Sequence, residues 1–526
     1  MATTAHPAHT RFLEARADRT ERAAARAGYE LCHVLTDLLD EALRELAGDA
    51  GTYAIVAVGG YGRRAQSRHS DVDVMLLIDG ADEGALRALY PLWDANLKVG
   101  HSVRTVAQAM TAADQNVETF TALLDARFIT GNRALYDRLL RERRGLVRRH
   151  RGRMRSELAQ RRAALVAKEP WQLLAVDLKN GRGGLRDIHA LHWLDAAEAI
   201  ANDQPVPPLP HDIATAELHL VRTRNAVHAL TERPSDVYRP DQANEVARWL
   251  GGVDSLEWGR TLYASMRLVD AAAEARLSER PSRFRFPWQR APKPAAPAID
   301  PGASDLDQIR AVLRTMAPGG ALDPLPRSAS LDRLLPEWEV LRARPHIAPF
   351  HIHPVDVHVA RAVSEARRVM EEDEFDSGTP RVAEEFGDAD EVLLAAFMHD
   401  IGKGHGGNHS DVGAVIAERF VTRAGLSGEQ GLRLVATVRQ HLLLPNVATR
   451  RDIADPEVIE ETARRIGDAR TLRLLYLLSV ADARASGPNV WSQWKAQLMR
   501  ACYQRLLRVL EAEAPDAQMP TIEGVA

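Results

Sequence analysis

The chain has 526 residues, of which 45% are hydrophobic and 27% charged, an ordinary balance for a globular protein of about three domains. Its formal net charge of −4 argues against a general nucleic-acid binder, and its two cysteines exclude a disulfide scaffold. No apolar segment is long enough for a membrane span or a signal peptide, so we expect a cytoplasmic protein that does not contact membranes.

The N-terminal half has the pattern of an α/β unit followed by helices. Leucines at helical spacing predict a helix over 12–47. Two strands are predicted at 53–58 and 71–78, then a helix at about 83–96 and a short strand at 99–105. Residues 107–280 are mostly helical by pattern, interrupted by the glycine-rich segment 180–187.

Proline recurs through 281–304, a composition that predicts a linker and a domain boundary. From about 305 to 512 the pattern is helical with no convincing strand, and 513–526 is expected to fray. The predicted class is therefore α/β plus all-α. We expect N-terminal helices (1–50), an α/β core (51–135), a helical domain associated with it (136–280), the linker, an all-helical domain (305–512) and the tail.

The segment GGYGRRAQSRHSDVD at 59–73 has the composition of a nucleotide site. Alternate residues of a strand share one face, so Asp71 and Asp73 can together hold Mg²⁺, which prefers oxygen ligands and keeps places for phosphate oxygens. Glycines let backbone N–H groups approach a triphosphate. We expect Arg63 to neutralise the leaving pyrophosphate and Ser70 to add a hydroxyl contact. The predicted nucleotide-binding residues are Gly59, Gly60, Gly62, Arg63 and Ser70.

This arrangement resembles the polymerase-β-type nucleotidyltransferase superfamily, which implies such a domain at 51–135. A third carboxylate usually completes the site in that superfamily. Asp125 and Asp177 are both candidates, and each can equally be a surface aspartate.

A second chemical motif, FMHDIGKGHGGNHS, occupies 397–410. Its adjacent His399 and Asp400 can meet one metal between them, and imidazole and carboxylate ligands suit Mn, Fe, Zn or Mg. His358 upstream and Asp482 downstream complete an H…HD…D order that resembles the HD phosphohydrolase superfamily. A metal there lowers the pKa of a bound water and polarises a phosphoryl oxygen. Lys403 is expected to bind the phosphate as a point charge.

Other histidines near this motif divide into two classes. His409 and His441 are candidates for a second metal, whereas His351 and His353 are interpreted as incidental.

Several further phrases resemble the bifunctional PII uridylyltransferase/uridylyl-removing enzyme family, over about 30–510. They are LWDANLKVGHSVRT (92–105), GGLRDI (183–188), QHLL (440–443), RRDI (450–453) and LLYLLSVAD (474–482), followed by residues 491–495. The resemblance implies transfer of UMP from UTP to a tyrosine of the nitrogen-signalling protein PII, with Mg²⁺ on Asp71 and Asp73. It implies that the HD domain hydrolyses the UMP–tyrosine bond with Mn²⁺ or Mg²⁺ held by His358, His399, Asp400 and Asp482.

The sequence departs from the family in three respects. Relatives usually carry a Gly-Glu-Leu run where this chain has Arg64-Ala65-Gln66, and proline where it has Arg68, so an acid is missing beside the triphosphate site. Relatives also continue into two C-terminal ACT domains that sense glutamine, whereas this sequence stops just after the HD segment. The sequence is therefore interpreted either as truncated or as a short family member without that sensor, and glutamine control of this chain through ACT domains is expected to be absent.

These departures leave alternatives to the two-activity enzyme. One is an HD-only hydrolase with an inactive transferase domain, and another is a non-catalytic regulator that binds PII. A tRNA nucleotidyltransferase also joins such a transferase to helices, but the net charge and the GGLRD and VGHSVRT phrases argue against it.

Overall fold

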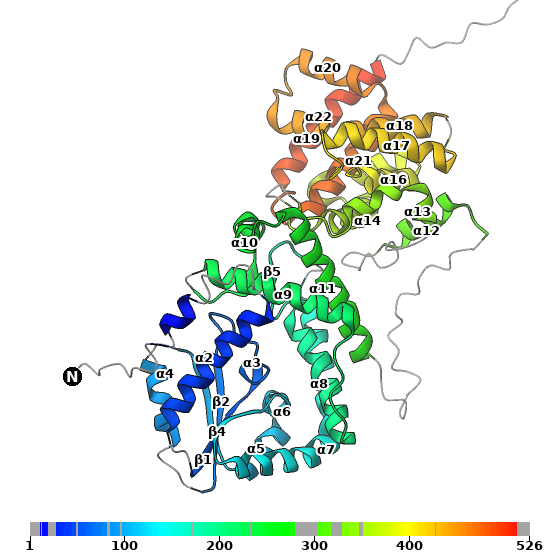
Figure 1. The fold of residues 1–526 in the computed structure, drawn as a ribbon. Helices are drawn as coiled ribbons and strands as arrows, with labels where there is room; N and C mark the ends of the chain where they lie inside the picture. The colour runs from blue at the N-terminus through cyan, green and yellow to red at the C-terminus, as the bar shows by residue number, and fades with distance from the viewer. Residues whose placement is uncertain are drawn as a thin grey trace, which may run out of the picture. The chain divides into compact units, whose positions relative to one another are not determined.

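The computed structural model describes residues 11, 13–18, 28–48, 51–80, 85–94, 97–169, 172–231, 233–278, 302–316, 329–346, 351–426 and 428–512. The chain divides into two compact units, each of which is described by itself (Figure 1). Unit 1 contains residues 1–170 and 175–285, and unit 2 contains 171–174 and 286–526.

Unit 1 is built on one mixed sheet with the strand order β3-β2-β1-β4. The strands are β1 (Tyr53–Ala57), β2 (Val72–Ile78), β3 (Val99–Arg104) and β4 (Arg127–Gly131). β1 is antiparallel to β2 and β4, whereas β2 and β3 are parallel. A 3₁₀ turn, η2 (Ala85–Leu89), and a short helix, α4 (Tyr90–Asp94), lie between β2 and β3 in the chain, because parallel neighbours need a crossover connection.

Both faces of this sheet are covered, and the strand residues alternate between two apolar cores. On one face, Ile55 and Leu76 pack with Leu39 and Leu43 of helix α2 (Tyr29–Ala47). On the other face, Val56 and other strand residues pack against the helices α5 (Val106–Gln115), α6 (Val117–Leu124), α7 (Arg133–Lys168) and α8 (Leu185–Asn202). The alternation decides which side of β2 each of its side chains faces.

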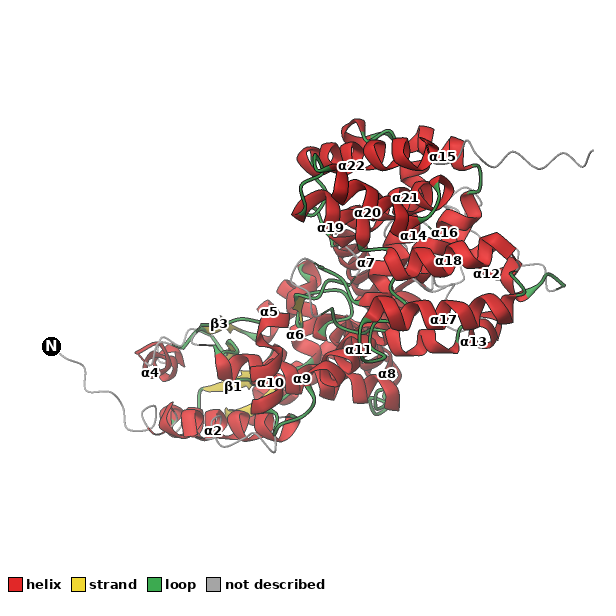
Figure 2. Ribbon diagram, turned by 90° about the horizontal axis from the view of Figure 1, so that it is seen from above, coloured by secondary structure: helices red, strands yellow, loops and turns green. Residues whose placement is uncertain are grey.

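The remaining elements of unit 1 are mostly helical, and Figure 2 shows the predominance of helix over strand. They are α3 (Gly59–Gly62), α9 (His211–Leu230), η3 (Pro240–Gln242), α10 (Ala243–Trp249), α11 (Ser255–Ser278) and the two-residue strands β5 (Val176–Asp177) and β6 (Val237–Tyr238). A buried ion-pair network joins three helices: Arg162 of α7 contacts Asp187 of α8 and Asp270 of α11.

Unit 2 has no strand among its described residues. Its elements are α12 (Asp305–Thr315), α13 (Ala329–Leu334), η4 (Pro336–Leu341), α14 (Val355–Glu371), η5 (Glu374–Asp376), α15 (Thr379–Phe386), α16 (Ala389–Met398), α17 (His409–Ala424), α18 (Gly428–Gln440), α19 (Leu443–Arg450), α20 (Pro456–Ile466), α21 (Ala469–Ser486) and α22 (Gln493–Ala512).

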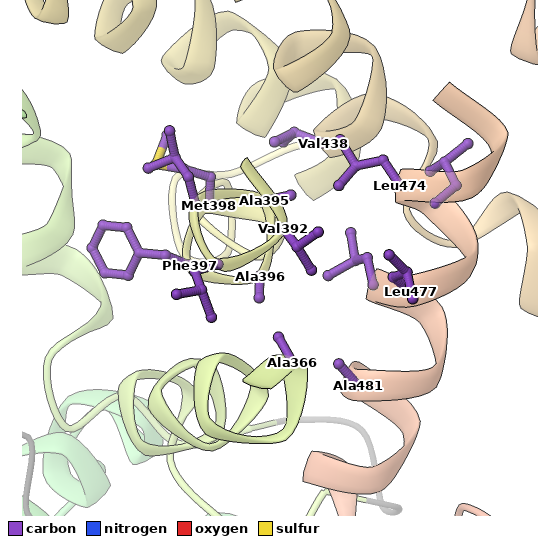
Figure 3. Close-up of a cluster of buried hydrophobic side chains, with 14 of the residues drawn as sticks. Ala366, Val392, Ala395, Ala396, Phe397, Met398, Val438, Leu474, Leu477 and Ala481 are labelled. Atoms are coloured by element: carbon purple, nitrogen blue, oxygen red, sulfur yellow. The ribbon is translucent and has the colours of Figure 1, made fainter. Parts of the chain in front are cut away.

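Helix α16 is the central element of unit 2. Every residue from 391 to 400 is buried. Figure 3 shows Val392, Ala396 and Phe397 of α16 among side chains of α14, α18 and α21. A helix that is apolar on all sides belongs inside a helical domain, and its C-terminal end delivers His399 and Asp400 to the interior.

The predicted fold class, α/β plus all-α, is confirmed. The helix predicted at about 83–96 is helical over its described part, 85–94, but begins as the 3₁₀ turn η2 before the short α4. The prediction that 107–280 is mostly helical missed the strand β4. This strand pairs with β1, with Phe128 opposite Val56, and forms one edge of the sheet. The linker lies almost entirely, and the tail wholly, outside the described residues. None of the described helices combines the length and the hydropathy that crossing a bilayer requires.

Candidate active sites

The first site is a cavity of about 510 Å³ in unit 1, lined by Asp71 and Asp73. Val72 and Val74 are buried in the core under α2, as expected from their positions between the aspartates. Alternation along the chain therefore turns both aspartates to the opposite side, toward the cavity. Asp71 itself immediately precedes β2 rather than belonging to it.

Asp73 fits only because its cross-strand neighbour on β3 has no side chain. Gly100 is the register partner of Asp73. A Cβ at Gly100 would lie 2.4 Å from Asp73 Oδ1, closer than any real contact. The glycine of the VGHSVRT phrase thus leaves room for the carboxylate, a role that the sequence pattern alone did not reveal.

The two aspartates make an electrostatically unfavourable pair that suits a cation. Burial, followed by the charge of Asp71, raises the pKa of the Asp73 carboxyl. Lys98 Nζ lies 3.0 Å from Asp71 Oδ2 and compensates part of this charge. Two neighbouring carboxylates on one wall of a cavity fit Mg²⁺, which takes oxygen ligands and relieves their mutual repulsion.

The glycine-rich segment forms the single helical turn α3 at the cavity wall. Gly59 and Gly60 line the cavity, and Gly59 has a positive φ of 58° that favours glycine. Gly62, which we expected at the nucleotide, does not line the cavity. Its hydrogen faces the backbone of Asp125 instead, because a Cβ there would lie 2.1 Å from the Asp125 carbonyl oxygen.

Arg63 and Asp125 form a buried ion pair in the same cavity. Asp125 Oδ2 also accepts from Trp193 Nε1 at 3.0 Å, while its Oδ1 is buried with no hydrogen-bond partner among the described residues. Burial raises the pKa of Asp125 although Arg63 opposes it. Arg63 is therefore already engaged by a carboxylate, rather than free to meet pyrophosphate alone.

The other candidate for a third carboxylate, Asp177, does not line the cavity. Its Oδ1 accepts from the backbone N–H groups of Lys179 and Asn180, both at 2.8 Å, so it caps a turn. Of the two candidates, only Asp125 lies in the site. Ser70 lines the cavity as expected, and its Oγ accepts from Ser67 N–H at 2.9 Å.

The structure adds basic residues that the motif analysis missed. Lys179, Arg186 and Arg224 all line the cavity. Lys179 lies just before the glycine-rich segment 180–187, and Arg186 lies in the first turn of α8. The glycines of this segment are required for packing: a Cβ at Gly183 would lie 1.9 Å from the Met266 carbonyl oxygen. These cations give the cavity a wall suited to phosphate groups.

The second site lies inside unit 2, where the four predicted HD residues converge from three segments. His358 comes from the first turn of α14, His399 and Asp400 from the end of α16, and Asp482 from α21. His358 Nε2 lies 3.0 Å from Asp482 Oδ1 and 3.3 Å from His399 Nε2. His399 Nε2 lies 3.2 Å from Asp400 Oδ2. The donor atoms therefore surround one small space.

His409 and His441 join this cluster from its other side. Together with Asp400 they form a second group whose ligand atoms lie within 4.8 Å of one another. His441 Nε2 lies 3.7 Å from Asp400 Oδ1. Burial lowers the pKa of His441 to about 4, and it lowers the pKa of His409 as well, so both rings favour the neutral form that binds metals.

The donor set fits divalent metal ions. Asp400 Oδ1 and His441 Nε2 are buried polar atoms without a hydrogen-bond partner among the described residues, as expected of ligand atoms that face an ion. His399 Nδ1 and His441 Nδ1 each lie 2.7 Å from a backbone carbonyl oxygen, which fixes their rings with Nε2 toward the cluster.

Lys403 occupies a different position from the one expected. Its Nζ donates to Asp400 Oδ2 at 2.6 Å, so its charge is paired with a candidate metal ligand. Burial raises the pKa of the Asp400 carboxyl, but Lys403 and His399 outweigh burial and hold the pKa well below its usual range. Lys403 also lines the adjoining cavity, where its charge remains close to an incoming phosphate.

The sequence analysis missed two histidines of this site. His351, which we interpreted as incidental, and His346 both line the cavity, and the His351 ring lies 4.6 Å from the His358 ring. His353 is buried, with Nδ1 2.8 Å from the Gln172 carbonyl oxygen. In the sequence, His351 is distinguished only by its position seven residues before His358. That spacing does not place the two rings together unless the path of the backbone before α14 is known.

The cavity beside the cluster has a volume of about 700 Å³. Asp400, His441 and Asp482 lie at its metal-binding part, and the wall also includes Trp491, Trp494, Lys495 and Arg450. Trp494 is 61% exposed. The combination of a His/Asp cluster, cations and aromatic side chains can accept a phosphodiester together with flat organic groups.

Comparisons with known proteins identify two matching families and several similar proteins. Residues 149–276 match the family described as GlnD PII-uridylyltransferase, and residues 358–486 match the HD domain. The chain is similar to proteins named bifunctional uridylyltransferase/uridylyl-removing enzyme. Identity to the one from Mycobacterium tuberculosis is 34%, over 92% of this chain and 67% of that protein. Identity to the protein from Streptomyces coelicolor is 32%, over 95% of this chain and 68% of that protein. Identity to the protein from Bordetella avium is 30%, over 90% of this chain and 65% of that protein. The chain thus spans about two thirds of the length of these relatives.

Proposed function

The chain belongs to the family of bifunctional uridylyltransferase/uridylyl-removing enzymes, and from this premise we propose that it adds UMP to PII and removes it again. The observation that carries the proposal is the presence of two separate sites in one chain. One has paired carboxylates on a nucleotide-sized cavity, and the other has a His/Asp cluster beside a second cavity.

In the transferase site, Asp71 and Asp73 would hold Mg²⁺, which when bound polarises the phosphate that is attacked. Gly59 and Gly60 offer backbone N–H groups to the triphosphate of UTP. Lys179 and Arg186, the latter in the first turn of α8, would balance the charge of the β- and γ-phosphates. The tyrosine hydroxyl of PII would approach the α-phosphate in line with the leaving pyrophosphate.

Arg63 has a positioning role in this proposal. Its ion pair with Asp125 and its place over the Trp193 ring, 5.6 Å from the centroid, fix the guanidinium beside the cavity. Asp125 is the proposed third acid of the site. Its unpartnered Oδ1 is the atom available to contact a cation or to accept the proton of the tyrosine hydroxyl.

In the hydrolase site, His358, His399, Asp400 and Asp482 would hold one metal ion, and Asp400, His409 and His441 a second. When bound, the metal supplies a hydroxide-like water for attack on the UMP–tyrosine phosphodiester. Lys403 holds Asp400 in place and adds positive charge where the phosphate would lie. We propose Mn²⁺ or Mg²⁺ at these mixed nitrogen and oxygen positions.

Separate substitutions test the two halves of the proposal. The chain is incubated with PII, α-labelled UTP and Mg²⁺, and label on PII is measured; label release is then followed without UTP in Mn²⁺. Asp73→Asn is expected to abolish labelling but to release UMP from pre-uridylylated PII at the parent rate. His399→Gln is expected to label PII normally and to release no UMP.

Matched controls use the same residue types outside the sites. Asp79→Asn removes an exposed carboxylate just after β2, and His405→Gln removes a ring that contacts the Glu337 carbonyl oxygen at 3.2 Å. Both should keep both activities. If the unsubstituted chain releases UMP but never labels PII, the transferase half is wrong and an HD-only hydrolase remains. If it does neither, PII is not its substrate.

A further inference from the structure

The hydrolase cluster is part of a longer row of histidine rings. From His346 the row runs through His351, His358, His399 and His441 to His409. Successive ring centroids lie 3.7, 4.6, 5.4, 5.6 and 5.3 Å apart. The last four rings belong to the two metal groups proposed above. The first two, His346 and His351, have no role in that proposal.

His346 and His351 have the spacing of metal ligands. Their rings stack at an interplanar angle of 19°, and both line the cavity. Each of His346, His351 and His358 can offer one ring nitrogen, and these three atoms lie within 4.8 Å of one another. Three nitrogens at that spacing can converge on one ion at about 2.1 Å once the two stacked rings rotate so that a nitrogen of each faces the ion.

An independent observation concerns the second nitrogen of His358. A metal-binding histidine usually donates its other ring N–H to a carbonyl or carboxylate, and His399 and His441 both have such a carbonyl partner. His358 differs: its Nε2 faces the HD cluster, while its Nδ1 is buried without a hydrogen-bond partner in the described part of the chain. A buried unpartnered nitrogen beside two further imidazoles indicates a missing ligand.

We propose that His346, His351 and His358 form a third metal position, specific for a borderline transition-metal ion such as Zn²⁺. The position contains imidazoles only, whereas each of the other two groups includes a carboxylate. Zn²⁺ suits neutral nitrogen ligands, and Mg²⁺ prefers oxygen, so Mg²⁺ does not fill it. His358 then contacts one ion through each nitrogen, and the Nδ1 proton passes to solvent on binding.

The position also has a consequence for the hydrolase, which rests on the proposed function. An ion held by His346 and His351 lies at the wall of the same cavity as Asp400 and Lys403. Such an ion would add positive charge at the wall where the phosphodiester would lie. Binding of the ion itself requires neither PII nor UTP, so the two proposals can fail separately.

The test counts zinc ions in the full chain. The metal-free chain is dialysed against Zn²⁺, or against Mg²⁺ in parallel, and bound metal per chain is measured by mass spectrometry. His346→Gln and His351→Gln are each expected to bind one zinc ion fewer than the parent chain and to be unchanged in Mg²⁺. His405→Gln, which alters a histidine outside the row, should bind as much zinc as the parent.

An anomalous difference map at the zinc edge, from crystals of the unsubstituted chain, removes the dependence on variants that fold poorly. A peak between His346 and His351 is expected. Equal zinc content in the parent and both variants, or no peak at that position in a zinc-loaded crystal, would overturn the proposal and leave the pair with a packing role only. Loss of UMP release in the parent would refute the proposed hydrolase without affecting this count.

Discussion

Gly100 of β3 lies directly across from Asp73 of β2, and the absence of its side chain is what admits the Asp73 carboxylate. A Cβ at that glycine would lie 2.4 Å from Asp73 Oδ1. The carboxylate is the group proposed to hold Mg²⁺, so a single hydrogen on a neighbouring strand controls its position.

Gly100→Ala is therefore expected to lower uridylyl transfer by about 100-fold, since displacement of a reacting group by roughly 1 Å has an effect of that size. UMP release by the HD site should not change. The measurement is initial-rate labelling of PII and release from uridylyl-PII. The matched control is Gly152→Ala in α7, where a Cβ would meet no atom within 4 Å. Equal losses in the two variants would contradict the steric explanation.

The buried network around Arg162 is expected to dominate the stability of unit 1. Its side chain is 5% exposed and contacts Asp187 and Asp270, which are 8% and 10% exposed. Arg162→Met leaves these carboxylates without their main partner, and burial already raises the pKa of Asp187. We expect a loss of about 3–5 kcal/mol in the free energy of unfolding.

Chemical denaturation measures this loss. Arg138→Met on the same helix α7 is the control, because Arg138 pairs with Glu142 at the surface, 51% and 37% exposed. Such a pair contributes about 0.3–0.5 kcal/mol. A similar small effect for Arg162→Met would show that the network does not hold the three helices together.

Metal binding should stabilise unit 2 through the HD cluster. Adding Mn²⁺ to the metal-free chain is expected to raise the temperature of its unfolding transition. When the metal is at 100 times its Kd, binding increases the free energy of unfolding by about 2.7 kcal/mol. His399→Gln and Asp400→Asn remove ligands from the proposed first position and should reduce the shift strongly.

The shift is measured by calorimetry in chelator-treated protein. His405→Gln keeps all the proposed ligands and should show the parent shift. A full Mn²⁺ shift in both ligand variants would place the stabilising metal elsewhere in the chain.

His219 should make unit 1 sensitive to acid. Its ring stacks on Trp258 with centroids 3.8 Å apart, and its Nε2 lies 3.2 Å from the Trp258 carbonyl oxygen. Burial, assisted by Arg222, lowers the pKa of His219 to about 4 from 6.5. The unfolded chain therefore takes up a proton near pH 6.5, while the folded chain resists it until about pH 4.

The contribution of His219 to the free energy of unfolding is therefore fully present above pH 6.5 and is lost as the pH falls toward 4. The loss is on the order of 2–3 kcal/mol. Denaturation curves between pH 8 and 4.5 measure the slope, and His219→Gln should flatten it. The pH 8 values supply the control, since neither state binds the proton there. An unchanged slope in His219→Gln would assign the acid sensitivity to other groups.

The sequence predicts those parts of the two sites in which the residues lie close together along the chain. Asp71 and Asp73 share a face because a strand has a period of two, and His399 and Asp400 directly follow the buried helix α16; both relations follow from short segments. The apolar run of α16 likewise predicts a helix enclosed by others. These local relations were sufficient to indicate a paired-carboxylate site, an HD cluster and the α/β plus all-α class.

Only the tertiary structure decided which distant residues reach the sites. Packing of α14, α16 and α21 brings His358 and Asp482 to His399, and the β2–β3 register places Gly100 against Asp73. Asp125 lies at the cavity and Asp177 does not, a choice that depends on β4, which the helical pattern concealed. His351 joins the row through a segment with no periodicity to interpret. Sequence periodicity fixes the face of one element, whereas contacts between elements arise from the summed burial of many side chains.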